Sequence, residues 1–142
     1  MAVPDEVRKR FAEYVKVQAL DSRFISRDTE RKILEDGVMR FEIGLDDGRQ
    51  IMLGVAQECG YVFETEAEKR IRDILDGYAE DGRIDKREFT ESVAFLRKFC
   101  ANGLSEDEAR KRVKKIMLAN GWKPKRRGLL GTKRWFTRVE AD

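Results

Sequence analysis

Residues 65–100 read TEAEKRIRDILDGYAEDGRIDKREFTESVAFLRKFC and contain two helix starts separated by a turn. Thr65 and Glu68 have the spacing of a capping box, in which a hydroxyl and a carboxylate each accept a hydrogen bond from a backbone amide at the start of a helix. Asp85 and Glu88 repeat that spacing further along the chain. Apolar residues follow each start at helical intervals, and an Asp-Gly dipeptide between them is typical of a tight turn. The stretch therefore predicts two helices joined by a short turn.

The helical spacing of apolar residues continues on both sides of this stretch. We expect six helices, which begin near residues 4, 26, 46, 65, 85 and 105. Ser105 and Glu108 form a further capping box, while Gly60 and Gly121 follow the third and sixth helices, where a left-handed residue is common. Gly37 lies inside the second helix, where glycine costs about 1 kcal/mol relative to alanine. The pattern predicts an all-α fold.

The predicted helices fall into two similar sets. Residues around Phe11, Ile25, Gly44 and Cys59 match those around Ile71, Ile84, Gly103 and Asn120, in the same order and at spacings of 59 to 61. This recurrence predicts two pseudo-repeated three-helix units, at about 4–63 and 64–122, within a helical domain at 1–122. A unit of about sixty residues buries little of its surface, so we expect the two units to share one core.

The composition excludes several classes of function. The 142 residues include no histidine and two cysteines, so histidine-based acid/base catalysis, Ser-His and Cys-His nucleophiles and ordinary zinc sites are excluded. Cys59 and Cys100 lie on apolar stripes, where a thiol behaves as a small hydrophobic residue. Charged residues make up 40% of the chain and its mean hydropathy is -0.63, so no membrane span is expected. We predict a cytoplasmic protein that is not an enzyme, because no leader pattern and no catalytic constellation are recognisable.

The turn at residues 77–88 resembles an EF-hand calcium loop. Asp81, Asp85 and Glu88 occupy the fifth, ninth and twelfth positions of that pattern, and a glycine occupies the sixth. A glycine and an alanine stand at the first and third positions, where a calcium site has oxygen ligands. The resemblance implies a divalent cation such as calcium on the three carboxylates, whereas a capping box explains Asp85 and Glu88 without a metal.

The stretch from Tyr78 to Glu88 is also similar to the acidic Asp-Gly turn of TerB-like tellurite-resistance proteins. That family consists of all-helical proteins tied to stress responses and, in some members, to metal ions. The similarity covers about a dozen of the 142 residues, so it implies a helical fold more than a function.

Residues 123–142 form a basic tail, with seven Lys and Arg residues against two acidic ones. The candidate binding residues are Lys123, Lys125, Arg126, Arg127, Lys133, Arg134, Trp135 and Arg138, with Trp122 and Phe136 as further rings. Cations beside flat rings suit an acidic protein, and also single-stranded nucleic acid or an anionic membrane. Alternatively, Leu129, Leu130, Trp135 and Phe136 pack on the helices while the charges stay solvated. Short apolar segments around residues 131–132 also suggest a β-hairpin.

These observations favour a non-enzymatic interaction or regulatory module. Its helices would present a groove between the two units, and the tail would act as a cationic anchor for an acidic protein partner. The alternative is a nucleic-acid-associated protein that binds through the tail. A further alternative is a helix pair that responds to a divalent metal ion.

Overall fold

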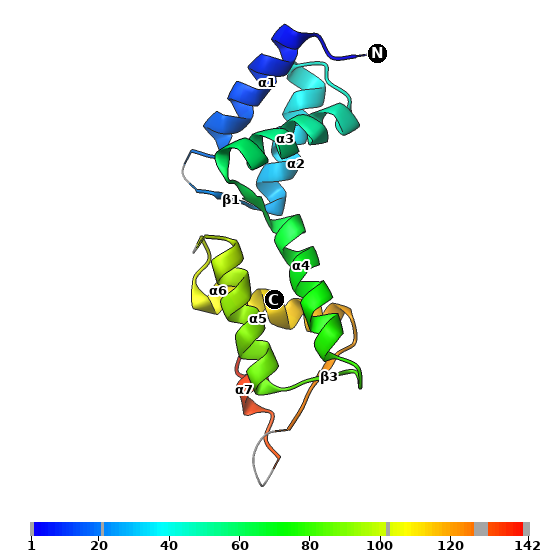
Figure 1. The fold of residues 1–142 in the computed structure, drawn as a ribbon, viewed down its shortest axis with the longest axis vertical. Helices are drawn as coiled ribbons and strands as arrows, with labels where there is room; N and C mark the ends of the chain where they lie inside the picture. The colour runs from blue at the N-terminus through cyan, green and yellow to red at the C-terminus, as the bar shows by residue number, and fades with distance from the viewer. Residues whose placement is uncertain (1, 21, 102, 127–130, 141–142) are drawn as a thin grey trace. The chain divides into compact units, whose positions relative to one another are not determined.

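The computed structural model describes residues 2–20, 22–101, 103–126 and 131–140 (Figure 1). The chain divides between Thr65 and Glu66 into two compact units, the first unit and the second unit. Most of the described residues are helical, which confirms the predicted helical fold. Among the described residues, no helix is long and apolar enough to cross a membrane.

The first unit contains three helices and a small parallel sheet in its described part. In chain order its elements are α1 (Asp5–Gln18), β1 (Phe24–Ile25), α2 (Arg27–Arg40), α3 (Leu45–Cys59) and β2 (Val62–Phe63). The two strands pair in parallel, so Phe24 lies opposite Val62 and Ile25 opposite Phe63. This pairing joins the segment after α3 to the segment that precedes α2.

The chain continues through α4 (Glu64–Tyr78) into the second unit. The later elements are β3 (Arg83–Ile84), α5 (Lys86–Phe99), α6 (Glu106–Ala119), β4 (Lys123–Pro124) and α7 (Arg134–Thr137). β3 and β4 also pair in parallel, with Arg83 opposite Lys123 and Ile84 opposite Pro124. The second unit therefore has a helix, a strand, two helices and a strand in the same order as the first, followed by one more short helix.

Two capping boxes form as the sequence predicts. The Asp85 carboxylate accepts a hydrogen bond from the N–H of Glu88 (2.7 Å), and the Glu88 carboxylate accepts one from the N–H of Asp85 (2.9 Å). Ser105 and Glu108 make the same exchange at the start of α6. These contacts satisfy backbone amides that a helix start leaves without an internal partner.

The capping box predicted at Thr65 is wrong, because α4 begins one residue earlier, at Glu64. Thr65 therefore lies in the first turn of the helix, and its hydroxyl donates to the carboxylate of Glu30 (3.2 Å). The Glu64 carboxylate accepts a hydrogen bond from the N–H of Arg27 at the start of α2 (2.7 Å). Contacts with the first turn of α2 thus accompany the beginning of α4.

The core of the first unit explains the glycine inside α2. Buried members of this core are Phe11, Val15, Ala19, Ile25, Ile33, Leu34, Ile43, Ile51, Met52, Val55, Ala56 and Phe63. A Cβ atom at Gly37 would lie 3.0 Å from the Phe11 ring, closer than an ordinary carbon–carbon contact. Glycine is intrinsically unfavourable inside a helix, but at position 37 it allows α2 to pack closely against the Phe11 ring of α1.

The second unit has buried residues on every helix that the sequence predicts. They include Ile71, Leu75, Phe89, Val93, Leu96, Ala109, Val113 and Met117, and Ile84 of β3 is buried as well. Cys100 is fully buried and Cys59 is half-buried against the first unit's core, as expected of structural thiols. The shared core and the groove between the units stay predictions.

The predicted β-hairpin is wrong for the described part of the tail. Lys123 and Pro124 pair with β3 instead of with a later tail segment, and residues 134–137 form the helix α7. A strand would direct Trp135 and Phe136 to opposite faces. The helical turn instead buries Phe136 while Trp135 packs edge-on against it, with ring centroids 5.8 Å apart. Residues 127–130, including the predicted apolar segment at 129–130, lie outside the described residues.

Candidate functional site

The beginning of the basic tail is built into the second unit. The N–H of Lys123 donates to the carbonyl of Gly82 (3.0 Å), and the N–H of Lys125 donates to the carbonyl of Ile84 (2.8 Å). Pro124 lies between them and is buried. These bonds attach the tail to the turn between α4 and α5, so its cations extend from a fixed backbone.

Lys114 of α6 holds the end of the tail. Its ammonium group donates to the carbonyls of Phe136 (3.0 Å) and Val139 (2.7 Å), and it lies 4.5 Å from the centroid of the Phe136 ring. A cation is favourable at both kinds of position, the carbonyl end of a helical turn and the face of an aromatic ring. Lys114 thereby fixes the segment after Lys133 against α6.

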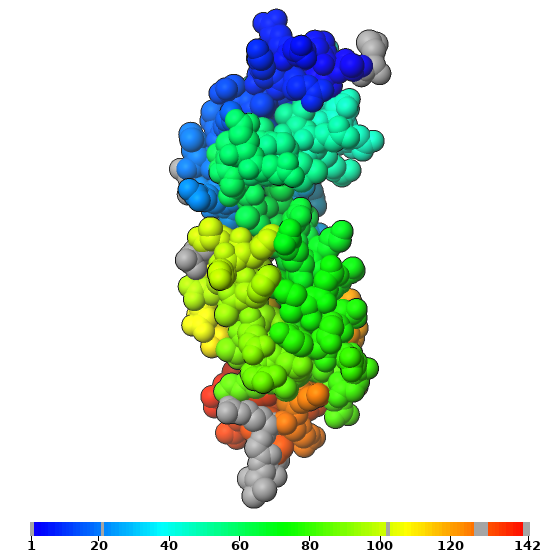
Figure 2. All heavy atoms as spheres, in the orientation of Figure 1, coloured from blue at the N-terminus to red at the C-terminus, as the bar shows by residue number. Residues whose placement is uncertain are grey.

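Trp135 attaches the same segment to α5. Its ring lies 5.4 Å from the ring of Phe89, at an angle of 56°, and its indole N–H donates to the carbonyl of Lys125 (3.2 Å). In the space-filling view, the α7 segment (red) lies directly against the surface of α5 (yellow-green) (Figure 2). The prediction that Trp135 and Phe136 pack on the helices is confirmed.

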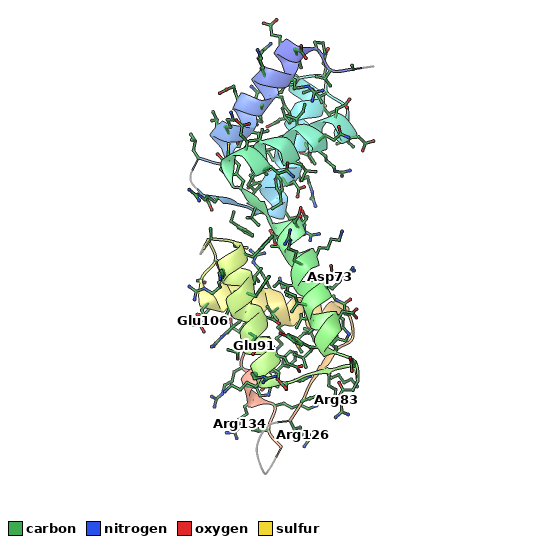
Figure 3. The ribbon with its side chains drawn as sticks, in the orientation of Figure 1. Asp73, Arg83, Glu91, Glu106, Arg126 and Arg134 are labelled. Carbon is green, nitrogen blue, oxygen red and sulfur yellow. The ribbon has the colours of Figure 1, made fainter. Side chains whose placement is uncertain are left out.

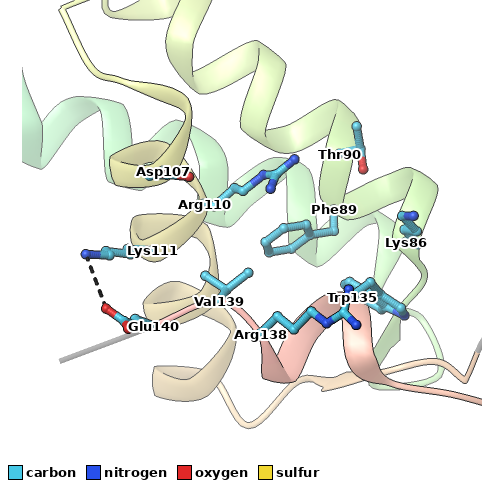
Figure 4. Close-up of a pocket in the computed structure, with 10 residues that line it drawn as sticks. All are labelled: Lys86, Phe89, Thr90, Asp107, Arg110, Lys111, Trp135, Arg138, Val139 and Glu140. Carbon is cyan, nitrogen blue, oxygen red and sulfur yellow. Dashed lines mark ion pairs between the residues drawn. The ribbon is translucent and has the colours of Figure 1, made fainter.

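A pocket of about 490 Å³ lies where α5, α6 and the tail meet (Figure 4). Its lining comprises Lys86, Phe89 and Thr90 from α5, Asp107, Arg110 and Lys111 from α6, and Trp135, Arg138, Val139 and Glu140 from the tail. Figure 4 shows the Phe89 ring between the side chains of Arg110 and Arg138, which extend in the same direction. The pocket thus combines an aromatic and aliphatic surface with four cations.

The cations of the pocket differ in their partners. The Arg110 guanidinium contacts the Glu106 carboxylate at 3.0 Å, and the Lys111 ammonium lies 3.9 Å from the Glu140 carboxylate. Neither Lys86 nor Arg138 has an ion-pair partner within the part of the chain that the structure describes. Those two side chains are the ones most available to an anionic ligand.

The other predicted cations of the tail lie outside the pocket. Lys123, Arg126 and Arg134 are exposed, and Figure 3 shows Arg126 and Arg134 at the same end of the second unit. Lys125 pairs with the Asp81 carboxylate (3.3 Å), and Lys133 is half-buried. Trp122 is half-buried outside the pocket, and Arg127 lies outside the described residues. Of the predicted binding residues that the structure describes, Trp135 and Arg138 are thus the ones that reach the pocket.

The sequence predictions missed the residues that α5 and α6 contribute to the pocket. Phe89 follows a predicted helix start at helical spacing, and Arg110 and Lys111 are two of several bases inside the sixth predicted helix. Neither pattern indicates a ligand site until the tail lies across both helices. The only local signal was the cluster of bases and rings in the tail, which pointed to one wall of the pocket.

The three carboxylates of the EF-hand-like turn have separate roles. Those of Asp85 and Glu88 complete the capping box of α5. Asp81 accepts a hydrogen bond from the N–H of Arg83 (3.0 Å) and pairs with Lys125; the backbone bond first, and then the lysine, hold its pKa below the usual value. Gly82 adopts φ 76°, as the predicted turn requires. Among the described residues, no group of three or more Cys, Asp or Glu side chains is placed to hold a metal ion.

No protein-family model, curated protein or solved structure matches the chain. The similarity to EF-hand and TerB-like turns therefore stays a prediction from about a dozen residues. Any function has to be argued from the residues of the pocket and of the surface around it.

Proposed function

We propose that this chain is a non-enzymatic interaction module that binds an acidic protein partner through its second unit. The observation that carries the proposal is the pocket, where Lys86 and Arg138 stand beside the apolar surface of Phe89, Trp135 and Val139. Protein interfaces combine apolar anchors with charges that select the partner, and arginine and aromatic residues are enriched in them.

The distribution of charge between the units supports an acidic partner. Residues 1–65 include 10 Lys and Arg and 13 Asp and Glu, a net charge of −3, whereas residues 66–142 include 20 and 14, a net charge of +6. A cationic unit attracts acidic partners over distances of about a Debye length, which speeds their encounter. The acidic first unit does not offer that attraction.

Nucleic acid is the second candidate ligand, and the surface that would bind it lies outside the pocket. Lys123, Arg126 and Arg134 are exposed tail cations outside the pocket, where they could contact phosphates. Asp107 and Glu140 also line the pocket, and they repel phosphates and carboxylates alike. A peptide can offset that repulsion with backbone N–H donors, which a chain of phosphates does not have. The geometry of the pocket therefore supports the acidic protein first.

We also infer that the two units are pseudo-repeats and that the module works in the cytoplasm. Phe24 and Arg83 are the first residues of the first strand in each unit. The backbone N–H of each donates a hydrogen bond of 3.0 Å to the side chain two residues earlier, which is Ser22 or Asp81. These pairs are 59 residues apart, which is the spacing of the sequence recurrence. The thiols of both cysteines support a reducing compartment.

The test is a two-dimensional amide NMR titration of the full chain. The probe is a short peptide rich in Glu and Asp that carries one apolar residue, and its control replaces every acid by Gln or Asn. We expect the acidic peptide to shift amides of α5, α6 and residues 131–140, with much weaker shifts from the control.

Titrations with single-stranded DNA, with single-stranded RNA and with calcium distinguish the alternatives. Shifts that appear only with single-stranded DNA or RNA, around Lys123, Arg126 and Arg134, would replace the proposal by nucleic-acid binding. Shifts around Gly82 on addition of calcium would favour the metal-responsive helix pair. An acidic peptide that shifts only the first unit would overturn the proposal.

A further inference from the structure

We infer that the pocket of the second unit recognises a short peptide pattern, one large apolar side chain with carboxylates on either side of it. The inference rests on the proposed function and deepens it. An acidic partner that used the whole cationic surface would need no pattern, whereas a partner seated in the pocket needs an anchor residue as well as charge.

The apolar part of the pattern follows from the floor of the pocket. Phe89 is buried to 4% exposure, Trp135 and Val139 are half-buried, and all three face one cavity of about 490 Å³. Cavities of about 300 to 1,000 Å³ are the usual size of binding pockets, and tilted aromatic rings accept a further ring at an edge or a face. One large side chain, with part of its neighbours, is the peptide element that fits this space.

The acidic part of the pattern follows from the two cations without partners in the described chain. Arg138 comes from the tail and Lys86 from the first turn of α5, and both line the pocket beside Trp135 (Figure 4). Carboxylates next to the anchor residue can reach these cations, and arginine offers a carboxylate two parallel N–H donors. Arg110 adds a third positive group above Phe89, although Glu106 already pairs with it.

A peptide fits this lining better than a nucleic acid does. Asp107 and Glu140 line the same pocket, and their carboxylates can accept the hydrogen bonds that the backbone N–H groups of a peptide donate. A phosphodiester chain has no backbone donor of that kind. Lys86 and Arg138, which have no ion-pair partner among the described residues, could contact about two phosphates. Binding of single-stranded nucleic acid there would release few counterions, with a salt slope of about −0.7 for each phosphate contacted, so the electrostatic affinity would be small.

The test uses Trp135 as its reporter. The chain has two tryptophans, and Trp122 is not part of the pocket, so Trp122→Phe leaves one indole at the site. The full-length variant is titrated with acetyl-Glu-Asp-Phe-Asp-Glu-amide, with the same peptide carrying alanine in place of phenylalanine, and with Gln-Asn-Phe-Asn-Gln. A short oligothymidylate serves as the nucleic-acid probe.

We expect the first peptide to bind at least about tenfold more tightly than the alanine peptide, because burial of the phenylalanine contributes to its affinity. Arg138→Glu is expected to weaken binding by about fivefold or more, since it replaces an attraction by a repulsion. The matched control is Arg134→Glu, which makes the same charge change on the same tail at an exposed site outside the pocket. This control should leave the affinity within about twofold.

The outcomes separate the two proposals. Equal affinity for the phenylalanine and alanine peptides, with equal losses in Arg138→Glu and Arg134→Glu, would overturn the pocket pattern and keep an acidic partner on the general surface. Failure of every acidic peptide to bind would overturn both proposals. Tighter binding of the oligothymidylate would reassign the ligand to nucleic acid. Circular dichroism and melting temperature show that each variant is folded before its affinity is compared.

Discussion

The two units have the same order of helices and strands, yet they use their aromatic residues in opposite ways. In the first unit, Phe11, Tyr14 and Phe41 pack on one another, with the rings of Tyr14 and Phe41 5.4 Å from each other. In the second unit, Phe89 and Trp135 are equally close but face a pocket. The difference comes from the tail, which continues past β4 and lies on α5 and α6. The same order of helices and strands thus acquires a candidate binding site through one added segment.

The largest effect is expected in the core of the first unit. Phe11 is fully buried and its ring would lie 3.0 Å from a Cβ atom at Gly37. Because the ring fills a buried space, Phe11→Ala should cost about 3–5 kcal/mol of unfolding free energy. Leu53→Ala, at a half-exposed site of α3, is the control and should cost less than about 1 kcal/mol. Chemical denaturation of the full chain measures both.

Amide exchange of the Phe11→Ala variant then tests how the units are coupled. If they share one core, as the sequence predicts, residues such as Ile71 and Leu75 should lose protection together with α1 and α2. Loss of protection confined to residues 2–65 would refute the shared core. If Phe11→Ala lowers the unfolding free energy by less than about 1 kcal/mol, the packing of α2 on Phe11 is contradicted.

The second prediction removes the feature that distinguishes the second unit. Lys114→Met keeps the length of the side chain but loses both hydrogen bonds to the tail, so we expect a loss of about 2 kcal/mol and detachment of residues 134–140. Trp135, Arg138, Val139 and Glu140 would leave the pocket with that segment, and binding of the acidic phenylalanine peptide should be lost. Trp135 fluorescence and the peptide titration measure the two effects.

Lys115→Met is the matched control, because Lys115 is the exposed neighbour of Lys114 on α6 and makes no hydrogen bond or ion pair with the described residues of the tail. It removes the same charge and should leave the Trp135 spectrum unchanged. If Lys114→Met also leaves the spectrum and the peptide affinity unchanged, the tail is held mainly by the packing of Phe136 and Trp135, and Lys114 does not position the pocket.

How much the sequence could predict depends on how local each interaction is. Asp85 and Glu88 bond to each other's backbone three residues apart, so a short pattern was enough to predict their box. The start of α4 depends on contacts with Glu30 and Arg27, more than thirty residues away, and the local pattern at Thr65 was misleading. Long-range contacts of this kind leave no signal in a single sequence.

The candidate site follows the same rule. Trp135 and Arg138 were predicted from composition, because bases and rings gathered in the tail are visible without a structure. Lys86, Phe89 and Arg110 become pocket residues only when α7 forms and packs between their helices. The sequence favoured a hairpin over that helix, so the wall formed by α5 and α6 could not be inferred.

The third prediction compares two helix starts. Asp85→Ala removes a cap whose carboxylate accepts the N–H of Glu88, and we expect a loss of about 1 kcal/mol. Thr65→Ala removes a residue inside the first turn of α4 and one hydrogen bond to Glu30, so the loss should stay near about 0.5 kcal/mol. Thermal or chemical unfolding ranks the two variants. A larger loss at Thr65 would restore the capping box predicted there.

The smallest effect is expected at two turns, one before the first strand of each unit, which differ in charge. Ser22 and Asp81 each accept a hydrogen bond from the N–H two residues later, but only Asp81 is ionisable and pairs with Lys125. The pKa of Asp81 is lowered in the folded state, so its carboxylate stabilises the fold above the ordinary Asp pKa, and this contribution is lost as the pH falls through the lowered value. Asp81→Asn should therefore lower the melting temperature slightly at pH 7 and leave it unchanged near about pH 2. Ser22→Ala, the matched change in the first unit, should shift the melting temperature by the same amount at both values. A pH-independent effect of Asp81→Asn would mean that the turn is stabilised by its backbone hydrogen bond alone, and that the charge of Asp81 adds nothing to the attachment of the tail.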